Sequence, residues 1–274
     1  IKTPEQTSGL IAELKGLCGS DTPLIAVDQE GGRVQRIKFT KTYPTAASFG
    51  ELFEDSPDAA KHQCQTAAQE MAEELVNLGF NLDFAPVADV RHAGAHDVIG
   101  DRAYHQRPAI VSELVGAALQ GLYASGCAPC LKHIPGHGRA TADSHTELPR
   151  VTTSAQNLLA EAEAFMAHTD CPYIMTAHVR YDVWDSQPAS FSKIILQDIL
   201  RGEMNMTGKI IADDLCMNAL EGSLLERAER TFDAGADLAI VSFSNMQHGF
   251  AGQWADAQFE KEAESLLNLP KNVA

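Results

Sequence analysis

Short apolar runs alternate with longer amphipathic segments along this chain, and the alternation restricts its fold more than any other feature. Short runs bounded by Gly, Pro or polar residues are typical of buried strands, whereas the longer segments are typical of helices. The predicted strands lie near Leu24–Asp28, Leu82–Ala88, Ala128–His133, Tyr173–His178, Lys209–Asp213 and Leu238–Phe243. The predicted helices are Pro57–Leu78, Ala109–Ala124, Ala155–Ala167, Lys193–Glu203, Leu220–Ala234 and Phe259–Leu267. Strands separated by helices indicate an α/β fold with a parallel sheet.

Polar side chains at the ends of the predicted strands distinguish between two arrangements of such a sheet. An open doubly wound sheet spreads the carboxyl ends of its strands along an edge, whereas a barrel gathers them around one pocket. The polar residues at or just beyond these ends are Asp28, Asp89, Lys132, His133, His178 and Asp213. We therefore predict a TIM-type (β/α)8 barrel that forms a single domain over residues 1–274, with its remaining strands before Ile1 or unrecognised.

Composition and charge exclude several classes of partner. With 274 residues and 45% hydrophobic content, the chain can bury a large core. Its formal charge of -16 repels nucleic acid and anionic membranes, and no apolar run approaches the roughly 18 residues of a membrane span. The N-terminus lacks the apolar core of a signal peptide, and six scattered cysteines favour a reducing compartment. We expect a cytoplasmic monomer that binds a small-molecule substrate.

The pair Cys127 and Cys130 matches a C-x-x-C redox pattern, but it lies in a predicted strand rather than at the start of a helix. Alternation along a strand would point the two side chains to opposite faces. We therefore expect two small buried hydrophobic residues and no redox centre at this position.

The segment 132–145 concentrates ionisable side chains on irregular backbone. Its proline and glycines break any helical register, so His133 and His137 cannot form the one-face pair of a helical metal motif. Asp143 and His145 are close enough for the carboxylate to bond a ring nitrogen, orient the imidazole and raise its pKa. Because such a dyad can act first as a general acid and then as a base, the segment is predicted to be an active-site loop.

A pair of carboxylates follows the apolar strand predicted at Lys209–Asp213. Carboxylates at strand ends of a barrel are commonly nucleophiles, bases or ligands, and we predict that Asp213 is the nucleophile. Asp214 would point the other way if the strand continues, so it is expected to bond nearby backbone or to cap the next helix.

A second polar cluster follows the first predicted strand. Asp28 is placed there to accept hydrogen bonds from substrate hydroxyl groups. The guanidinium groups of Arg36, in the same cluster, and of Arg102, in a later segment, would each donate several hydrogen bonds to hydroxyl or carbonyl oxygens. The adjacent Gly31 and Gly32 would let the backbone approach a ligand closely. This cluster is therefore predicted to bind the substrate.

Taken together, these motifs resemble those of family 3 glycoside hydrolases, specifically the single-domain bacterial β-N-acetylglucosaminidases of peptidoglycan recycling. The matching segments are Asp28–Arg36, Phe84–Val87, Lys132–Gly138, Asp143–His145, Ala177–Val179 and Asp213–Leu215. The resemblance implies that Asp213 is the nucleophile and that His145, paired with Asp143, is the acid/base on a mobile loop. It also implies sugar contacts from Asp28, Arg36, Arg102, Lys132 and His133.

The resemblance and the residue chemistry agree on a two-step retaining mechanism with a covalent glycosyl-enzyme. The implied substrate is terminal β-linked GlcNAc on GlcNAc-1,6-anhydroMurNAc, with or without peptide, in a Gram-negative cytoplasm. Two departures from the family pattern are visible. Ala212 stands where the family usually has Ser or Thr, which removes one hydrogen bond near the nucleophile. The chain also begins at Ile1, after the family's first barrel strand, so that strand region is expected to be absent from it.

Two other functions are compatible with the residue types. A metal-dependent hydrolase on the same barrel would use the ligands His133, His137, His145 and Asp213, although the neighbouring Lys132 would repel the metal. A noncatalytic sugar-binding protein would need only the arginines and Asp28, and it leaves the dyad unexplained. No Gly-x-Gly-x-x-Gly follows a strand and no P-loop is present, so we expect no nucleotide cofactor. No His-x-His stands at an early strand end, so we expect no cofactor metal either.

Overall fold

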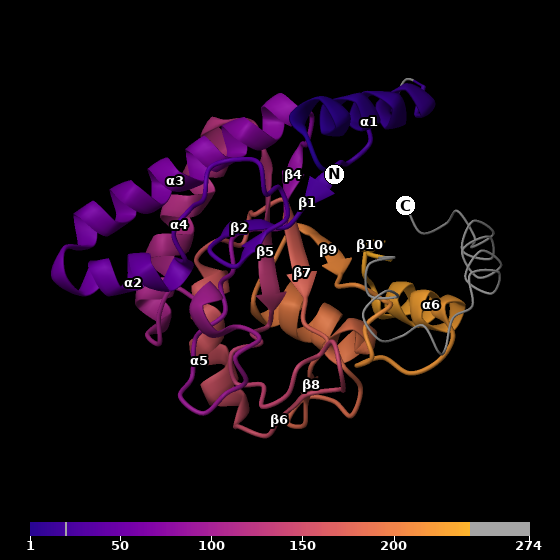
Figure 1. The fold of residues 1–274 in the computed structure, drawn as a ribbon. Coiled ribbons are helices and arrows are strands. Elements are labelled where there is room, and N and C mark those ends of the chain that lie inside the picture. The colour runs from indigo at the N-terminus through magenta and orange to yellow at the C-terminus, as the bar shows by residue number, and fades with distance from the viewer. Residues whose placement is uncertain (20, 242–274) are drawn as a thin grey trace.

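The computed structural model describes residues 1–19 and 21–241, and its centre is a six-stranded sheet (Figure 1). The strands lie in the order β1, β4, β5, β7, β9 and β10, and each neighbouring pair is parallel. Their bounds are Ala26–Val27, Leu82–Asp83, Ala128–Ile134, Tyr173–Thr176, Lys209–Ala212 and Leu238–Ala239. The predicted strands and the parallel α/β sheet are therefore confirmed, although residues 242–243 of the last predicted strand lie outside the described residues.

Helix α1 precedes the first strand, and the other helices occupy the connections between the strands and pack on the outside of the sheet (Figure 1). Their bounds are α1 Pro4–Leu17, α2 Ala46–Asp55, α3 Pro57–Leu78, α4 Pro108–Ala124, α5 Ala155–Met166, the π-helix η3 Ile194–Glu203 and α6 Leu224–Ala234. The predicted helix 220–234 begins later than expected because Ser223 and Glu226 form a capping box. The helix predicted at 259–267 lies outside the described residues.

The sheet curls so that its helices lie outside and its carboxyl ends share one side, which is the arrangement of a β/α barrel (Figure 1). In the described part of the chain, β1 and β10 are its two edges and do not pair with each other. The barrel-type prediction is thus confirmed as a curled, TIM-barrel-like sheet, while a closed ring of eight strands is not seen among residues 1–19 and 21–241.

Strand β5 lies at the centre of the packing. On the face of the sheet that packs against the helices, Leu131 is fully buried in one hydrophobic cluster with Ile174 and Ile210. Burial of each such side chain contributes about 1.5–3 kcal/mol. On the opposite face, Cys130 packs with Leu82, Met175 and Ile211. Cys127 directly precedes β5 and belongs to a separate cluster with Ala72 and Leu122, so the two cysteines are buried apart from each other as free thiols, as predicted, although Cys127 lies outside the strand.

The hairpin of β2 (Gln29–Gly31) and β3 (Val34–Gln35) follows β1 and turns through two glycines with positive φ. A Cβ on Gly31 would lie 2.6 Å from the carbonyl oxygen of Pro44, and one on Gly32 would lie 2.6 Å from Cγ2 of Thr45. The glycines therefore allow the hairpin to pack closely against its own chain at Pro44 and Thr45.

The remaining described strands, β6 (Arg150–Val151) and β8 (Arg180–Tyr181), pair in parallel outside the main sheet. They link the loop that follows β5 with the loop that follows β7. None of the described helices is both long enough and apolar enough to span a membrane.

Candidate active site

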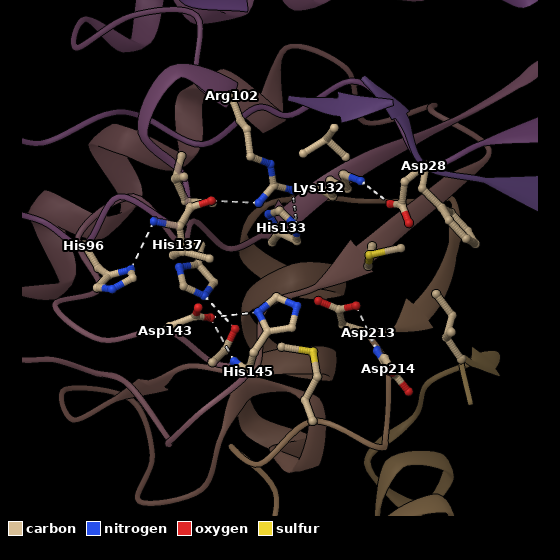
Figure 2. A pocket seen from close by; sticks show the side chains of 18 of the residues that line it. Asp28, His96, Arg102, Lys132, His133, His137, Asp143, His145, Asp213 and Asp214 are labelled. Atoms are coloured by element: carbon tan, nitrogen blue, oxygen red, sulfur yellow. Dashed lines mark hydrogen bonds and ion pairs between the residues drawn. The ribbon is translucent and has the colours of Figure 1, made fainter. Parts of the chain in front are cut away.

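A cavity of about 550 Å³ opens at the carboxyl ends of the strands. The residues predicted for the site all line it, namely Asp28, Arg36, Arg102, Lys132, His133, Asp143, His145 and Asp213. Figure 2 labels all of these side chains except that of Arg36 and shows them arriving from separate elements, among them β5 for Lys132 and the end of β9 for Asp213. Because these residues are far apart in the sequence, the fold itself assembles a single candidate site.

Lys132 is the buried cation of the cavity. Its Nζ lies 2.8 Å from Oδ1 of Asp28 and 2.7 Å from Oε1 of Glu30, and its side chain is 1% exposed. Glu30 also accepts hydrogen bonds of 2.8 Å from both Nε and Nη2 of Arg102. Burial raises the pKa of Glu30, but the charges of Lys132 and Arg102 outweigh it and hold that pKa far below its usual range. The network therefore presents fixed charged donors to the cavity.

The pKa of Lys132 is shifted in the complementary direction. Burial lowers this pKa, whereas the carboxylates of Asp28 and Glu30 raise it to a value above the usual range of lysine. Lys132 is consequently an ammonium group at neutral pH and a donor only.

Arg36 extends from the same hairpin toward solvent. Its side chain is 64% exposed, and its Nε lies 3.9 Å from Oδ2 of Asp28. An ion pair of this length and exposure contributes little to stability. The guanidinium of Arg36 can therefore turn toward a ligand at little cost.

Asp89 is fully buried and holds His133 of β5 and His137 of the loop that follows β5. Its Oδ2 lies 2.7 Å from Nδ1 of His133, and its Oδ1 accepts the backbone N–H of His137 at 2.6 Å. Burial raises the pKa of Asp89, but the two histidines lower it below its usual value overall. With Nδ1 of His133 bonded in this way, its Nε2 faces Arg102, 3.4 Å from Nη2.

Asp213 directly follows β9, and its Oδ1 accepts the backbone N–H of Asp214 at 2.8 Å. Burial raises the pKa of Asp213, but the charges of His178 and His133 and this hydrogen bond lower it overall. The carboxylate is therefore ionised at neutral pH, as a nucleophile must be. Asp214 bonds nearby backbone, accepting the N–H of Cys216 at 3.0 Å, as predicted for the second carboxylate.

Asp143 and His145 form the predicted dyad. Oδ1 of Asp143 lies 2.7 Å from Nδ1 of His145 and accepts the backbone N–H of the same histidine at 2.9 Å. Burial raises the pKa of Asp143, but these bonds from His145 lower it overall. In Figure 2 the other ring nitrogen, Nε2, points toward Asp213. The dyad thus directs one ring nitrogen into the cavity and fixes the other.

The roles of two residues in this arrangement were not predicted, although Asp89 was expected at the carboxyl ends of the strands. Glu30 joins Lys132 to Arg102, and Asp89 orients His133. Glu30 stands two residues after Asp28, and side chains spaced by two on an extended segment share a face. That spacing could have placed Glu30 beside Asp28 in the site. The contact of Asp89 with His133 could not be predicted in this way, because it depends on how β4 and β5 pair.

The ligands of the metal-dependent alternative are engaged with other groups. His133 bonds Asp89, His145 bonds Asp143, and Nε2 of His137 lies 3.2 Å from Oγ of Ser144. Within the part of the chain that the structure describes, no three His, Cys, Asp or Glu side chains converge as a metal-binding group. The geometry therefore gives this alternative no support.

Comparison with known proteins decides the family. The profile described as "Glycosyl hydrolase family 3 N terminal domain" matches residues 1–267. This chain belongs to glycoside hydrolase family 3. It is 39% identical over 248 residues to the Beta-hexosaminidase of Thiobacillus denitrificans, an alignment that covers 88% of this chain and 68% of that protein. The chain spans about two thirds of the length of such curated relatives, 64% in the case of Bordetella avium.

Solved family 3 structures share the fold. NagZ from Neisseria gonorrhoeae, in complex with N-trifluoroacetyl-D-glucosamine, superposes with a TM-score of 0.83 at 34% identity, covering 96% of this chain and 79% of that one. A family 3 β-N-acetylglucosaminidase from Paenibacillus has a TM-score of 0.81 at 30% identity, covering 97% and 53%. The chain is thus a glycoside hydrolase that groups with the β-N-acetylhexosaminidases of family 3, and the resemblance inferred from its motifs is confirmed.

Proposed function

We propose that this chain is a retaining exo-β-N-acetylglucosaminidase that forms a covalent glycosyl-enzyme, with residues 1–274 acting as one catalytic domain. The observation that carries the proposal is that Asp213 and the Asp143–His145 dyad line the same cavity as a fixed network of charged donors and acceptors. A cavity of about 550 Å³ lies within the range of small-molecule sites, roughly 300–1,000 Å³.

In the first step, an oxygen of Asp213 attacks the anomeric carbon while the bond from this carbon to the leaving oxygen breaks. Protonated His145 gives the proton on Nε2 to the leaving oxygen, and Asp143 at Nδ1 stabilises the imidazolium before the transfer. Because the pKa of Asp213 is lowered, its carboxylate is ready to attack without prior loss of a proton.

In the second step, water attacks the same anomeric carbon and the ester bond to Asp213 breaks. His145, now neutral, accepts the proton of the water through Nε2 and returns to its first state. Two displacements at one carbon leave the configuration unchanged, which is the definition of a retaining enzyme. A histidine in place of the usual second carboxylic acid does not alter this stereochemistry.

The sugar is proposed to lie against the buried network. Asp28 would accept from hydroxyl groups, whereas Lys132 and Arg102 would donate to hydroxyl oxygens, since both are held charged. His133 would contribute Nε2, because Asp89 holds its other ring nitrogen. Arg36 would close over the sugar from the exposed side.

The proposed substrate is terminal β-linked GlcNAc on muropeptide fragments, either GlcNAc-1,6-anhydroMurNAc or its peptide-bearing form. The N-acetylated sugar is supported by the relatives called Beta-hexosaminidase and by the N-trifluoroacetyl-D-glucosamine complex of the Neisseria protein. The fragment is supported by the motif resemblance to enzymes of peptidoglycan recycling. All six cysteines are free thiols, which supports a reducing compartment such as a cytoplasm.

Release of nitrophenol from paired aryl β-N-acetylglucosaminide and aryl β-glucoside substrates tests the activity. We expect cleavage of the acetamido substrate alone, with and without EDTA, and loss of nearly all activity in Asp213→Asn. His145→Ala should lose far more activity on poor leaving groups than on nitrophenolate, which hardly needs protonation. Chelator-sensitive turnover, or normal turnover by Asp213→Asn, would reject the proposed mechanism.

A further inference from the structure

Ser144 lies between the two residues of the proposed dyad, and its surroundings differ from theirs. Ser144 is 3% exposed, whereas the side chain of His145 is 52% exposed. Oγ of Ser144 lies 3.2 Å from Nε2 of His137, and its carbonyl oxygen accepts the backbone N–H of Ala219 at 3.2 Å. The dyad of the exposed His145 and the half-buried Asp143 is therefore fastened to the body of the protein through the residue between its members.

The partner of Ser144 is itself fixed. His137 is 4% exposed, and its backbone N–H donates to Oδ1 of Asp89 at 2.6 Å. The preceding residue, Gly136, accepts a hydrogen bond of 2.9 Å from the hydroxyl of Tyr181, which is fully buried. A continuous set of bonds thus runs from the buried Asp89 through His137 to the dyad loop.

The protonation state of His137 suits this role. Burial, assisted by the charge of His133, lowers the pKa of His137 to about 4, while Asp89 and Asp213 act in the opposite direction. His137 is therefore neutral at pH 7 and has one ring proton. Among the described residues Nδ1 has no hydrogen-bond partner. Placing the proton on Nε2 lets the ring donate to Ser144, and it avoids burying an unbonded N–H at Nδ1.

We propose that Ser144 and His137 are positioning residues, and that the bond between them sets the place of the His145 ring relative to the leaving oxygen. This inference rests on the proposed function, because it assigns no role to the pair unless His145 is the acid/base. Neither residue is proposed to exchange a proton with the substrate. A misplacement of about 1 Å in a catalytic group costs roughly 100-fold in rate, so a single hydrogen bond at this point is enough to matter.

Ser144→Ala, assayed on a series of aryl and alkyl β-N-acetylglucosaminides, tests the inference. We expect kcat to fall roughly 10- to 100-fold on the poorest leaving groups and by less than about threefold on nitrophenolate. The loss should increase with the pKa of the leaving group, as for His145→Ala but with a smaller slope. Ser125→Ala is the matched control. Its Oγ donates to the carbonyl oxygens of Gln69 and Gly121 at the far end of the fold, so the slope should be unchanged.

Two substitutions of His137 separate the hydrogen bond from the space that the ring fills. His137→Gln places an amide near the position of Nε2, whereas His137→Phe keeps a ring without a donor. We expect the glutamine variant to retain near-normal dependence on the leaving group and the phenylalanine variant to resemble Ser144→Ala. The double variant Ser144→Ala/His137→Phe should lose no more than either single variant, since both remove the same bond. Near-ultraviolet circular dichroism verifies that each variant is folded.

The outcomes separate this inference from the proposed function. If His145→Ala shows a strong dependence on the leaving group while folded Ser144→Ala shows none, or loses activity equally on all substrates, the positioning role is overturned and the function stands. If His145→Ala itself lacks that dependence, the proposed function fails and the positioning role fails with it.

Discussion

The buried carboxylate Glu30 offers the sharpest test of how the substrate side of the cavity is built. Glu30→Gln keeps the shape of the side chain but removes the charge that faces Lys132 at 2.7 Å and Arg102 at 2.8 Å. Breaking a buried ion pair by removing one partner costs about 3–5 kcal/mol. Because Asp28 still lies 2.8 Å from Lys132, we expect the lower end, about 3 kcal/mol.

Urea unfolding of Glu30→Gln measures this cost, with Glu70→Gln as the control. Glu70 pairs with Lys41 on the surface, where both side chains are more than 40% exposed, so its loss should cost less than about 1 kcal/mol. In thermal unfolding, the same cost of about 3 kcal/mol should lower the melting temperature of Glu30→Gln by roughly 6–12 °C, at about 2–4 °C per kcal/mol. A loss no larger than that of the control would refute the idea that Glu30 holds the network together.

The same variant has a pH signature. The folded-state pKa of Glu30 lies below the ordinary value of about 4.3, so its stabilisation is complete above that pH. As the pH falls further, the unfolded state binds a proton before the folded state does, and the stabilisation is lost toward the folded pKa. The difference in unfolding free energy between the native protein and Glu30→Gln should therefore shrink in acid. A difference that does not change between pH 7 and pH 3 would contradict the assignment.

Three further outcomes are expected. The pKa of His137 falls from about 6.5 in the unfolded chain to about 4 in the folded protein, so the free energy of unfolding should fall by roughly 3 kcal/mol as the pH drops from the first value to the second. Urea midpoints measured across this pH range should show the dependence in the native protein and a weaker one in His137→Gln. Leu131→Ala, at a fully buried position of β5, should cost about 2–5 kcal/mol in urea unfolding; a cost below about 1 kcal/mol would mean that the core tolerates the cavity. Arg36→Ala should lower kcat/KM roughly 10- to 100-fold without changing the melting temperature, because its side chain is mostly exposed; unchanged kinetics would remove it from the site.

The strands and most helices were predictable because their signals are local. The helix at Pro57–Leu78 begins with proline at its first position and ends before Gly79, whose φ is 104°, and these boundaries can be identified from the sequence. Helices α1 and α2 were missed because their apolar periodicity is weak or short. In α1 only Thr7 and Ile11 are buried, so its face toward the protein leaves little pattern.

The site residues were predictable where chemistry and position coincide. Asp213 directly follows a strand, and Asp143 lies two residues from His145, so both the nucleophile and the dyad could be predicted from their positions in the sequence. The partners of those residues depend on tertiary contacts instead. Asp89 meets His133, and Glu30 joins Lys132 to Arg102, only because β1, β4 and β5 lie side by side. The order of the strands is not contained in any local motif.

Trapping the glycosyl-enzyme tests the central claim most directly. A 5-fluoro β-N-acetylglucosaminide with a good leaving group should slow both steps but still allow the first, so the covalent intermediate should accumulate. We predict that mass spectrometry finds one sugar per chain, esterified to Asp213, and that Asp213→Asn forms no such adduct. An adduct on another residue, or cleavage without any adduct and with inversion at the anomeric carbon, would contradict the account.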